Sequence, residues 1–398
     1  MKKILTLNPI AKVGLDLLDP RVYTVGDSVA EPDAILVRSA TMHEMQFSES
    51  LLAVARAGAG VNNIPLDTLA EKGVVVFNTP GANANGVKEL TVAALILASR
   101  DIVGGAEWAE TQKDNPDVVK TVEKCKAKFA GHEIYGKTLG AIGLGAIGGP
   151  VANAAQKLGM KVIGFDPLLT VKAAWGLSET VARAESYEEI YAKSDYITLH
   201  VPANADTRGM ICGNTIAKMK DGVRILNLAR ADLVVAEDIK KALASGKVAS
   251  YVTDFPTPET LGVHGILNIP HLGASTEESE DNCAVMAAEE LKEFLETGNI
   301  KNSVNYPKVS LPYTGAARIC LCHKNLAGML SGITAVVSGA GINIENLSNG
   351  SRGDYAYTIV EILGEIPPAV TEALRALDGM IRVRVIDAPN RPPHGTVD

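Results

Sequence analysis

A glycine-rich turn between an apolar strand and a helix constrains the fold of this 398-residue chain more than any other feature. Residues 138–142 are predicted to form the strand, GLGAIG at residues 143–148 the turn, and residues 150–158 the helix. Glycines at this spacing allow a tight turn and let a pyrophosphate approach the backbone, and the first N–H groups of the helix attract its charge. The sequence therefore predicts a dinucleotide site in a parallel α/β domain. A glycine-rich turn in a flavodoxin-like domain is the alternative.

The residue that ends the next strand indicates which dinucleotide binds. Residues 161–165 are predicted to form this strand, and Asp166 follows it directly. A carboxylate at this place accepts hydrogen bonds from the hydroxyl groups of the adenine ribose. The next three residues are Pro167, Leu168 and Leu169, so no arginine is available there for a 2′-phosphate. The sequence predicts NAD rather than NADP as the cofactor.

Strand and helix segments alternate along most of the chain, which predicts parallel sheets. We expect residues 51–57 to form a short helix and residues 277–296 a long one that returns the chain to its first domain. A later strand–helix–strand–strand–helix–strand order predicts a small α+β domain. The predicted domains are residues 1–97 with 277–304, residues 98–276, a proline-bearing linker at 305–316, and a C-terminal domain at 317–390.

Charge and cysteine content limit the partners and the compartment. Lys and Arg number 38 and Asp and Glu 46, a net charge of −8, which argues against general binding to nucleic acid or an anionic membrane. The five cysteines are odd in number and scattered, which is typical of a reducing compartment. Cys320 and Cys322 would face one side of a strand, and no second pair completes a metal site. Since no apolar stretch is long enough to span a membrane, we expect a cytoplasmic protein without a metal.

Several segments carry a family resemblance. Between about residue 100 and residue 275 the chain contains, in order, GKTLGAIGLGAIG, VIGFDP, SDYITLHVP, ILNLARADLV, TDFPTPE and PHLGAST. This text resembles the D-isomer-specific 2-hydroxyacid dehydrogenases, and ILVRSAT, RAGAGVNNI and VFNTPGANANGVKEL resemble their substrate-binding domain. HKNLAGMLSGITAVVSGAGINIENLSN and AYTIVEI resemble an ACT regulatory domain. The resemblance implies two doubly wound parallel-sheet domains, Rossmann-like and flavodoxin-like, and a C-terminal ACT domain with a ferredoxin-like α+β fold.

The resemblance implies a catalytic set of Arg230, Glu259 and His271. Arg230 would bind the substrate carboxylate, His271 would transfer the hydroxyl proton, and Glu259 would hydrogen-bond His271 and favour its protonated form. Two positions depart from the family pattern, because alanine follows Arg230 in place of glycine and Pro258 precedes Glu259 rather than following it. The implied contacts to NAD are Gly143, Gly145, Ala146, Ile147, Gly148, Asp166, His200, Pro202, Thr207, Ala229, Asp254 and Gly273.

Basic and glycine residues near the N-terminus are implied to bind the substrate. They are Arg38, Ser39, Arg56, Gly58, Gly60, Val61 and Asn62. The glycine N–H groups can hold a carboxylate, and Arg38 and Arg56 could pair with a phosphate. Lys124, Lys126 and Lys128 could reach this site or that of a partner subunit, with a solvated charged face as the alternative.

The C-terminal segment implies regulation. His323, Asn325 and Asn343 match positions where ACT domains of this family hold L-serine, and asparagine can both donate to a carboxylate and accept from an ammonium. An ACT domain used only for assembly is the alternative. Since the family is built on dimers through its nucleotide domains and ACT sheets commonly pair, a homodimer or homotetramer is expected.

Within the family, the sequence most resembles members that act on a phosphorylated hydroxy acid. The implied reaction is NAD-dependent oxidation of 3-phospho-D-glycerate to 3-phosphohydroxypyruvate, the first step of phosphorylated L-serine biosynthesis. Another D-2-hydroxyacid dehydrogenase, such as a glyoxylate or hydroxypyruvate reductase, is one alternative. A non-catalytic, NADH-sensing binding protein of the same fold is the other.

Overall fold

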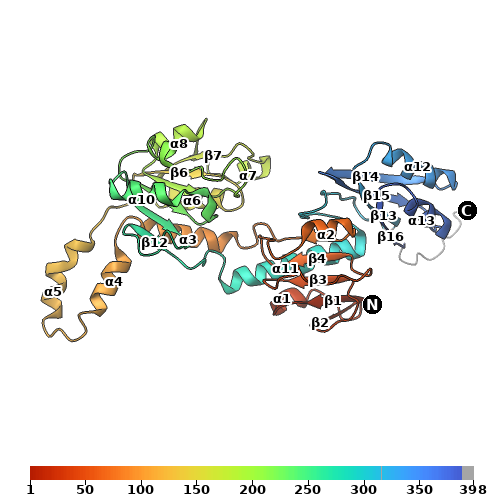
Figure 1. The fold of residues 1–398 in the computed structure, drawn as a ribbon, viewed down its shortest axis with the longest axis horizontal. Helices are drawn as coiled ribbons and strands as arrows, with labels where there is room; N and C mark the ends of the chain where they lie inside the picture. The colour runs from red at the N-terminus through yellow and green to blue at the C-terminus, as the bar shows by residue number, and fades with distance from the viewer. Residues whose placement is uncertain (315, 388–398) are drawn as a thin grey trace, which may run out of the picture. The chain divides into compact units, whose positions relative to one another are not determined.

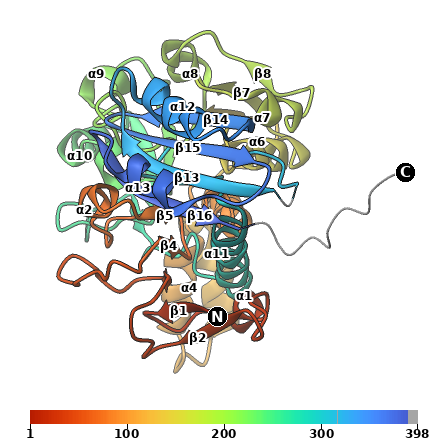
Figure 2. The same ribbon diagram turned by 90° about the vertical axis from the view of Figure 1, so that its right-hand side faces the viewer.

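The computed structural model describes residues 1–314 and 316–387, which form two compact units. The first unit contains Met1–Ala82 and the chain from Glu280 onward, and the second contains Asn83–Ser279 (Figures 1 and 2). The first unit thus combines an N-terminal and a later segment of the chain, and the second is one uninterrupted segment.

The second unit begins before the domain boundary that we expected after residue 97. Helix α3 (Ala84–Leu97) buries Val87 and Leu95 in the same core as Val151 and Leu226 of the second unit. A helix that shares a buried apolar core with a sheet is stabilised by that sheet, so α3 belongs to the second unit.

The second unit is built on a seven-stranded sheet in the order β12-β11-β10-β9-β6-β7-β8, with every neighbouring pair parallel. The strands are β6 (Thr138–Ile142), β7 (Lys161–Phe165), β8 (Ala182–Arg183), β9 (Tyr196–Leu199), β10 (Val223–Asn227), β11 (Val248–Thr253) and β12 (Ile266–Asn268). Because the chain enters at β6 and builds outward in both directions, the strand order reverses between β6 and β9. Ligands of open α/β sheets bind at such a reversal.

Helices cover both faces of this sheet. Helices α3 and α6 share one buried core with the strands, and α8, α9 and α10 share another. These helices and the remaining ones of the unit are α4 (Ile102–Glu110), α5 (Val118–Cys125), η1 (Lys126–Phe129), α6 (Gly148–Lys157), α7 (Val171–Trp175), α8 (Tyr187–Lys193), α9 (Gly213–Ile216), η2 (Ala231–Leu233) and α10 (Ala236–Ala244). Helices α4 and α5 extend away from the sheet as a hairpin, and neither contains a buried residue (Figure 1).

The N-terminal part of the first unit is a five-stranded parallel sheet in the order β2-β1-β3-β4-β5. Its elements are β1 (Lys2–Thr6), α1 (Lys12–Leu15), β2 (Tyr23–Gly26), β3 (Ala34–Val37), β4 (Ala53–Arg56), α2 (Leu66–Glu71), β5 (Val75–Phe77) and, from Glu280 onward, the long helix α11 (Glu277–Thr297). The helix expected at residues 51–57 is wrong, because β4 lies there. Ala53 and Ala55 enter one core and Val54 another, so this short apolar run is buried on both faces as a central strand.

The C-terminal part of the first unit is a four-stranded antiparallel sheet in the order β14-β15-β13-β16. Its elements are β13 (Ala317–Lys324), α12 (Met329–Gly339), β14 (Ile344–Arg352), β15 (Tyr355–Ile362), α13 (Pro368–Arg375) and β16 (Met380–Ile386). Helices α12 and α13 cover one face, where Ile333 and Leu374 pack against Leu321. The expected strand–helix–strand–strand–helix–strand order is confirmed.

The other face of the antiparallel sheet packs against the parallel-sheet part of the same unit. Cys320 and Cys322 of β13 and Tyr357 of β15 share a buried core with Phe77 and Phe294. Both cysteines are free and face this core, as expected for alternate residues of one strand. The two parts of the first unit are therefore joined by a continuous apolar core.

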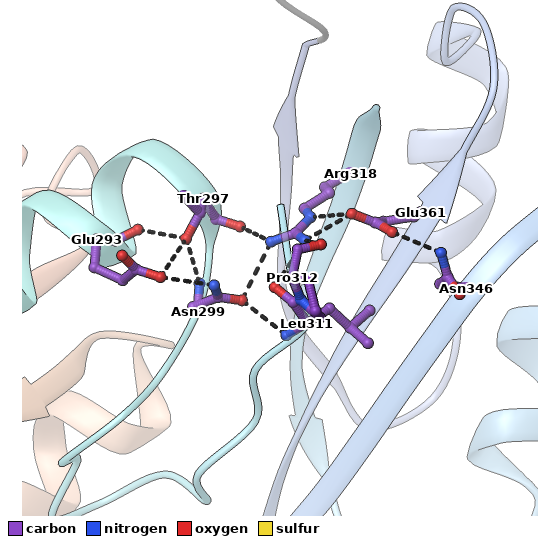
Figure 3. Close-up of polar contacts among 8 residues, drawn as sticks. All are labelled: Glu293, Thr297, Asn299, Leu311, Pro312, Arg318, Asn346 and Glu361. Atoms are coloured by element: carbon purple, nitrogen blue, oxygen red, sulfur yellow. Dashed lines mark hydrogen bonds and ion pairs between the residues drawn. The ribbon is translucent and has the colours of Figure 1, made fainter. Parts of the chain in front are cut away.

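A buried arginine strengthens this junction (Figure 3). The Arg318 side chain is fully buried, and its Nε donates to Oε1 of Glu361 at 2.8 Å. Its other nitrogens donate to the Thr297 carbonyl at the end of α11 and to the carbonyls of Leu311 and Pro312. Since Arg318 and Glu361 belong to the antiparallel sheet, one guanidinium ties this sheet to the end of α11 and to the connecting segment.

The connecting segment, expected as a linker at residues 305–316, is packed where the structure describes it. Tyr306 is fully buried and donates to the Ala70 carbonyl at 2.7 Å. Val309 pairs with Ile300 through an antiparallel bridge. Within the described part of the chain, no helix has both the length and the apolar character needed to cross a membrane.

Candidate functional site

The glycine-rich turn lies between β6 and α6, as predicted. Gly143 has φ +86°, and a Cβ there would lie 2.5 Å from the carbonyl oxygen of His200. A Cβ at Gly148 would lie 1.9 Å from the Gly143 carbonyl oxygen. Gly145, in contrast, has no heavy atom of the described chain within 4 Å of its Cβ position. Two glycines are therefore required by the turn itself, and the third faces open space at the N-terminus of α6.

Asp166 lies directly after β7 and beside this turn. Its Oδ2 accepts from the Leu144 N–H at 2.9 Å, and its Oδ1 accepts from the Leu168 N–H at 2.9 Å. The carboxylate thus fixes the backbone of the turn and keeps unused lone pairs for further donors. The structure thus brings Asp166 and the glycine-rich turn together, as the sequence predicts.

The residues expected to line the cofactor site after β9 and β10 are held by internal bonds. His200 Nε2 lies 2.9 Å from Oγ1 of Thr198, and burial lowers the pKa of the imidazole to about 4, so the ring is neutral at pH 7. Oγ1 of Thr207 donates to the Pro202 carbonyl at 2.5 Å and closes that loop. The N–H of Ala229 donates to Oδ1 of Asn227 at 3.2 Å.

Asn227 is a positioning residue that the sequence analysis missed. It is fully buried at the end of β10, its Nδ2 donates to the Arg230 carbonyl at 2.8 Å, and its Oδ1 accepts from the Arg230 N–H at 3.3 Å. The backbone of Arg230 is therefore fixed on both sides. An amide residue inside the apolar run ILNLA is the pattern that could have indicated it.

Arg230, Asp254 and His271 follow three adjacent parallel strands, β10, β11 and β12, and gather around Phe255. The His271 ring lies 4.6 Å from the Phe255 ring, and the Arg230 guanidinium carbon lies 5.9 Å from it. The His271 N–H donates to the Asp254 carbonyl at 3.0 Å, and His271 has φ +49°. A non-glycine residue with positive φ is uncommon and is often found at functional sites.

The Asp254 carboxyl is almost fully buried in this cluster. Its Oδ2 accepts from the Gly273 N–H at 3.2 Å, while its Oδ1 has no hydrogen-bond partner among the described residues. Burial raises the pKa of this carboxyl, partly offset by the Gly273 N–H and by the charges of His271 and Arg230. Since buried acceptors are normally satisfied, the free oxygen marks a place for an external donor.

Glu259, the predicted partner of His271, lies at the surface. In the described structure the two side chains share no hydrogen bond, and Glu259 is solvent-exposed with Thr257 and Lys240 holding the pKa of its carboxyl below the usual range. The role of Glu259 stays a prediction, and Asp254 is the carboxylate found beside His271.

The expected substrate-binding residues of the first unit lie on two neighbouring strand ends, after β3 and after β4. Arg38 and Ser39 are held by Asn8, whose Oδ1 accepts from their N–H groups at 3.2 and 3.0 Å. Arg56 Nε donates to the Arg38 carbonyl at 3.0 Å. Asn8, absent from the expected set, organises this loop.

The Arg38 side chain already has an anionic partner. Its two terminal nitrogens contact the two carboxylate oxygens of Glu280, with Nη1 donating to Oε2 at 2.9 Å. Both side chains are a little over two-fifths exposed, so the forked pair lies at the surface of the unit. The other expected residues, Gly58, Gly60, Val61 and Asn62, lie in the loop after β4, where Gly58 has φ +154°.

The expected regulatory residues differ in accessibility. His323 is buried, with Nδ1 2.8 Å from the Lys324 carbonyl and Nε2 2.9 Å from Oγ1 of Thr358. Asn325 is exposed and donates to the Gly353 carbonyl, and Asn343 is exposed and donates to Glu345.

The three lysines expected to form a second basic group lie at the end of α5 and in η1. All are exposed, and Lys126 pairs with Glu123. This arrangement agrees with the alternative, in which the three lysines form a charged, solvent-exposed surface next to the α4–α5 hairpin.

Comparison with known proteins identifies the class. Residues 92–275 match the D-isomer specific 2-hydroxyacid dehydrogenase, NAD binding domain. Over 94% of its length, the chain is 31% identical to a protein from Synechocystis sp. and spans 68% of that protein. The chain belongs to the family of D-isomer-specific 2-hydroxyacid dehydrogenases, and its expected NAD-binding domain and α/β fold are confirmed.

Two of the curated relatives carry the same name. The Synechocystis protein is a D-3-phosphoglycerate dehydrogenase, as is a Bacillus subtilis protein that is 35% identical over 74% of this chain. The chain spans only 56% of the Bacillus protein. The solved structure of an NAD⁺-bound 3-phosphoglycerate dehydrogenase from Entamoeba histolytica is 26% identical, covers 76% of this chain and 98% of that chain, and has a TM-score of 0.59.

Proposed function

We propose that this chain oxidises 3-phospho-D-glycerate to 3-phosphohydroxypyruvate with NAD, the first step of phosphorylated L-serine biosynthesis, in the cytoplasm. The observation that carries the proposal is the cluster of Arg230, Asp254 and His271 at the carboxyl end of the sheet that bears the glycine-rich turn. The names of the curated relatives support the choice of substrate.

The residues present fit NAD. The open space at Gly145 and the N-terminus of α6 would receive the pyrophosphate, and Asp166 would accept from the adenine ribose. The free, buried Oδ1 of Asp254 would accept from the nicotinamide carboxamide. NAD, when bound, supplies the hydride acceptor for the oxidation.

The chemistry left to the protein is charge binding and proton transfer. The Arg230 guanidinium can hold the substrate carboxylate with two parallel hydrogen bonds. The His271 imidazole takes the proton of the C2 hydroxyl during oxidation and returns it in the reverse direction. The Asp254 carboxylate, when ionised, stabilises the imidazolium through its charge. Glu259 remains the family-based candidate for orienting His271.

The phosphate of the substrate would be bound by Arg38 and Arg56 of the first unit. Since Glu280 already occupies the fork of Arg38, a phosphate must displace or share this partner. The N–H groups of the loop with Gly58 and Gly60 would hold the remaining negative charge. Ser39, Val61 and Asn62 complete the proposed contacts.

Replacing Asp166 tests the cofactor site. Asp166→Ala removes the acceptor for the ribose hydroxyls and the two bonds that fix the turn. We expect weaker NAD binding and a smaller preference for NAD over NADP, measured as the ratio of the two kcat/KM values. An unchanged ratio would show that Asp166 only caps the strand end.

The C-terminal antiparallel-sheet domain is proposed to be an ACT domain that binds L-serine. Its strand and helix order supports this proposal. Because both ring nitrogens of His323 are engaged within the chain, the exposed Asn325 and Asn343 would supply the contacts to serine. Inhibition requires that serine bind one conformation better than another. Calorimetry that detects no binding at millimolar serine would leave assembly as the role of this domain.

A homodimer or homotetramer is proposed from the α4–α5 hairpin. Neither helix buries a residue, and the apolar side chain of Val119 in α5 is 76% exposed. Apolar side chains on such a projection are stabilised when a partner covers them. Light scattering is expected to give a dimer or tetramer mass, and a monomer at micromolar concentration would contradict it.

The proposal as a whole is tested by following NADH absorbance with NAD and 3-phospho-D-glycerate. We expect turnover that saturates with substrate. A chain that binds NAD and yet produces no NADH would fit a binding protein of the same fold instead.

A further inference from the structure

A cavity of about 580 Å³ lies in the first unit where α2 meets the outermost strand of the antiparallel sheet, β16. Its lining includes residues 380–384 of β16 and the charged residues Glu49, Glu71, Lys72 and Arg375. Five consecutive residues of one strand line it, although alternate side chains of a strand point to opposite faces. The cavity therefore follows the edge of β16. Within the described part of the chain, β16 pairs with β13 alone (Figure 2).

The lining has an excess of positive charge. It contains four cationic side chains and two carboxylates. Lys72 and Glu49 form a long ion pair at 3.9 Å. Among the described residues, Arg375, Arg382 and Arg384 have no carboxylate within ion-pair distance. In the described part of the chain, the carboxylates of the lining are those of Glu49 and Glu71, so the lining keeps a net positive charge.

Two of these guanidinium groups are fixed by neutral acceptors. Arg382 donates to the carbonyls of Lys72 and Leu51 at 2.9 and 2.8 Å, and Arg384 donates to the carbonyl of Phe294 at 2.9 Å and lies over its ring. Backbone carbonyls orient a guanidinium and leave its net charge in place. The charges are therefore held in position before a ligand arrives, which lowers the cost of binding.

The walls of the cavity are also held together. A Cβ at Gly73, just after α2, would lie 2.7 Å from the Cβ of Arg382, so the two backbones meet closely there. The Cys322 thiol, on the strand next to β16, lies 3.7 Å from the Gly73 carbonyl oxygen. The cavity is a fixed feature of the junction between the parallel-sheet part and the C-terminal domain.

We propose that this cavity binds a small organic polyanion, with carboxylate or phosphate groups, as a ligand distinct from substrate and serine. Its volume lies in the range of small-molecule sites. The exposed Lys72 and Arg375 would contact the anion directly, Arg382 and Arg384 would attract it through their charge, and unpaired N–H groups at the edge of β16 would add donors. Such a ligand would touch both parts of the first unit and strengthen their junction.

The test is calorimetric titration of the full chain at low ionic strength with pyrophosphate and, separately, with citrate. The variant Lys72→Ala/Arg375→Ala removes the two exposed cations and keeps Arg382 and Arg384, which hold the C-terminal domain against the parallel-sheet part. The variant Lys113→Ala/Lys157→Ala removes two exposed cations of the second unit and serves as the matched control. Anion binding at the proposed catalytic site contributes equally to all three proteins.

We expect the wild type and the control to show one more anion site than the cavity variant, or an affinity for the anion at least tenfold higher. Without added anion, the three proteins should have the same melting temperature. Binding of pyrophosphate alone would assign a phosphorylated ligand, and binding of citrate alone a carboxylate ligand. Equal titrations of the cavity variant and the wild type, or no binding of either anion, would overturn the proposal. Arg382 and Arg384 would then serve only to hold the C-terminal domain against the parallel-sheet part. Because this readout is independent of turnover, it does not depend on the proposed reaction.

Discussion

His271→Ala is expected to lower kcat by roughly 10²–10⁴-fold, the usual loss when a general acid–base is removed. The imidazole lies beside Phe255 with Asp254 and Arg230 around it, and no other titratable imidazole is found in that cluster among the described residues. NAD binding should be retained, because the glycine-rich turn and Asp166 do not depend on this side chain. Steady-state kinetics with saturating NAD measures the effect.

His264→Ala is the matched control, since His264 lies in the exposed segment before β12. It should leave kcat within a factor of two or so of the wild type, as is usual for surface substitutions. If His271→Ala kept more than about a tenth of the wild-type kcat, another group would have to move the proton.

Arg318→Leu is expected to lower the free energy of unfolding of the first unit by about 3–5 kcal/mol, because it leaves the Glu361 carboxylate buried without a counter-charge. Glu361 is 1% exposed, and among the described residues its Oε2 accepts from Nδ2 of Asn346 alone. The carbonyls of Thr297, Leu311 and Pro312 lose their donor as well. Calorimetry reports the whole chain, while Trp108 and Trp175 fluorescence reports the second unit alone.

In Arg318→Leu, the calorimetric transition of the first unit should therefore move to a lower temperature, while the transition seen by tryptophan fluorescence should keep its midpoint. Arg208→Leu, which breaks the exposed pair with Asp232, is the control and should cost less than about 1 kcal/mol. Arg318→Leu/Glu361→Leu should recover part of the loss, since no unpaired charge remains buried. A single variant no more destabilised than the Arg208 control would show that the apolar core alone holds the C-terminal domain.

The sequence alone predicted the parts of the site that are built from residues close together in the chain. The glycine-rich turn and Asp166 were predicted because their spacing reports one strand–turn–helix unit and the strand after it, and the structure brings them together. Arg230 and His271 were also found at strand ends of the same sheet. Asp254 was expected as a cofactor contact, but its place beside His271 and the common neighbour Phe255 could not be predicted, since they depend on how three strands align.

Contacts between distant residues explain most of what the sequence did not predict. Arg38 pairs with Glu280, 242 positions away, and no local pattern indicates that its fork is occupied. His323 carries the right residue type for a ligand contact, yet both nitrogens are used within the sheet. Residues 51–57 contain good helix formers, but burial on both faces of a central position makes them a strand.

The central claim, that the site acts on the phosphorylated acid, is tested most directly by one ratio. In the same NADH assay, kcat/KM is measured for 3-phospho-D-glycerate and for D-glycerate, which differ only by the phosphate. Since leaving charged groups unpaired in a closed site costs about 2–5 kcal/mol, we predict a preference of at least roughly thirtyfold for the phosphorylated substrate. A ratio near one, or faster oxidation of D-glycerate, would contradict the proposed function.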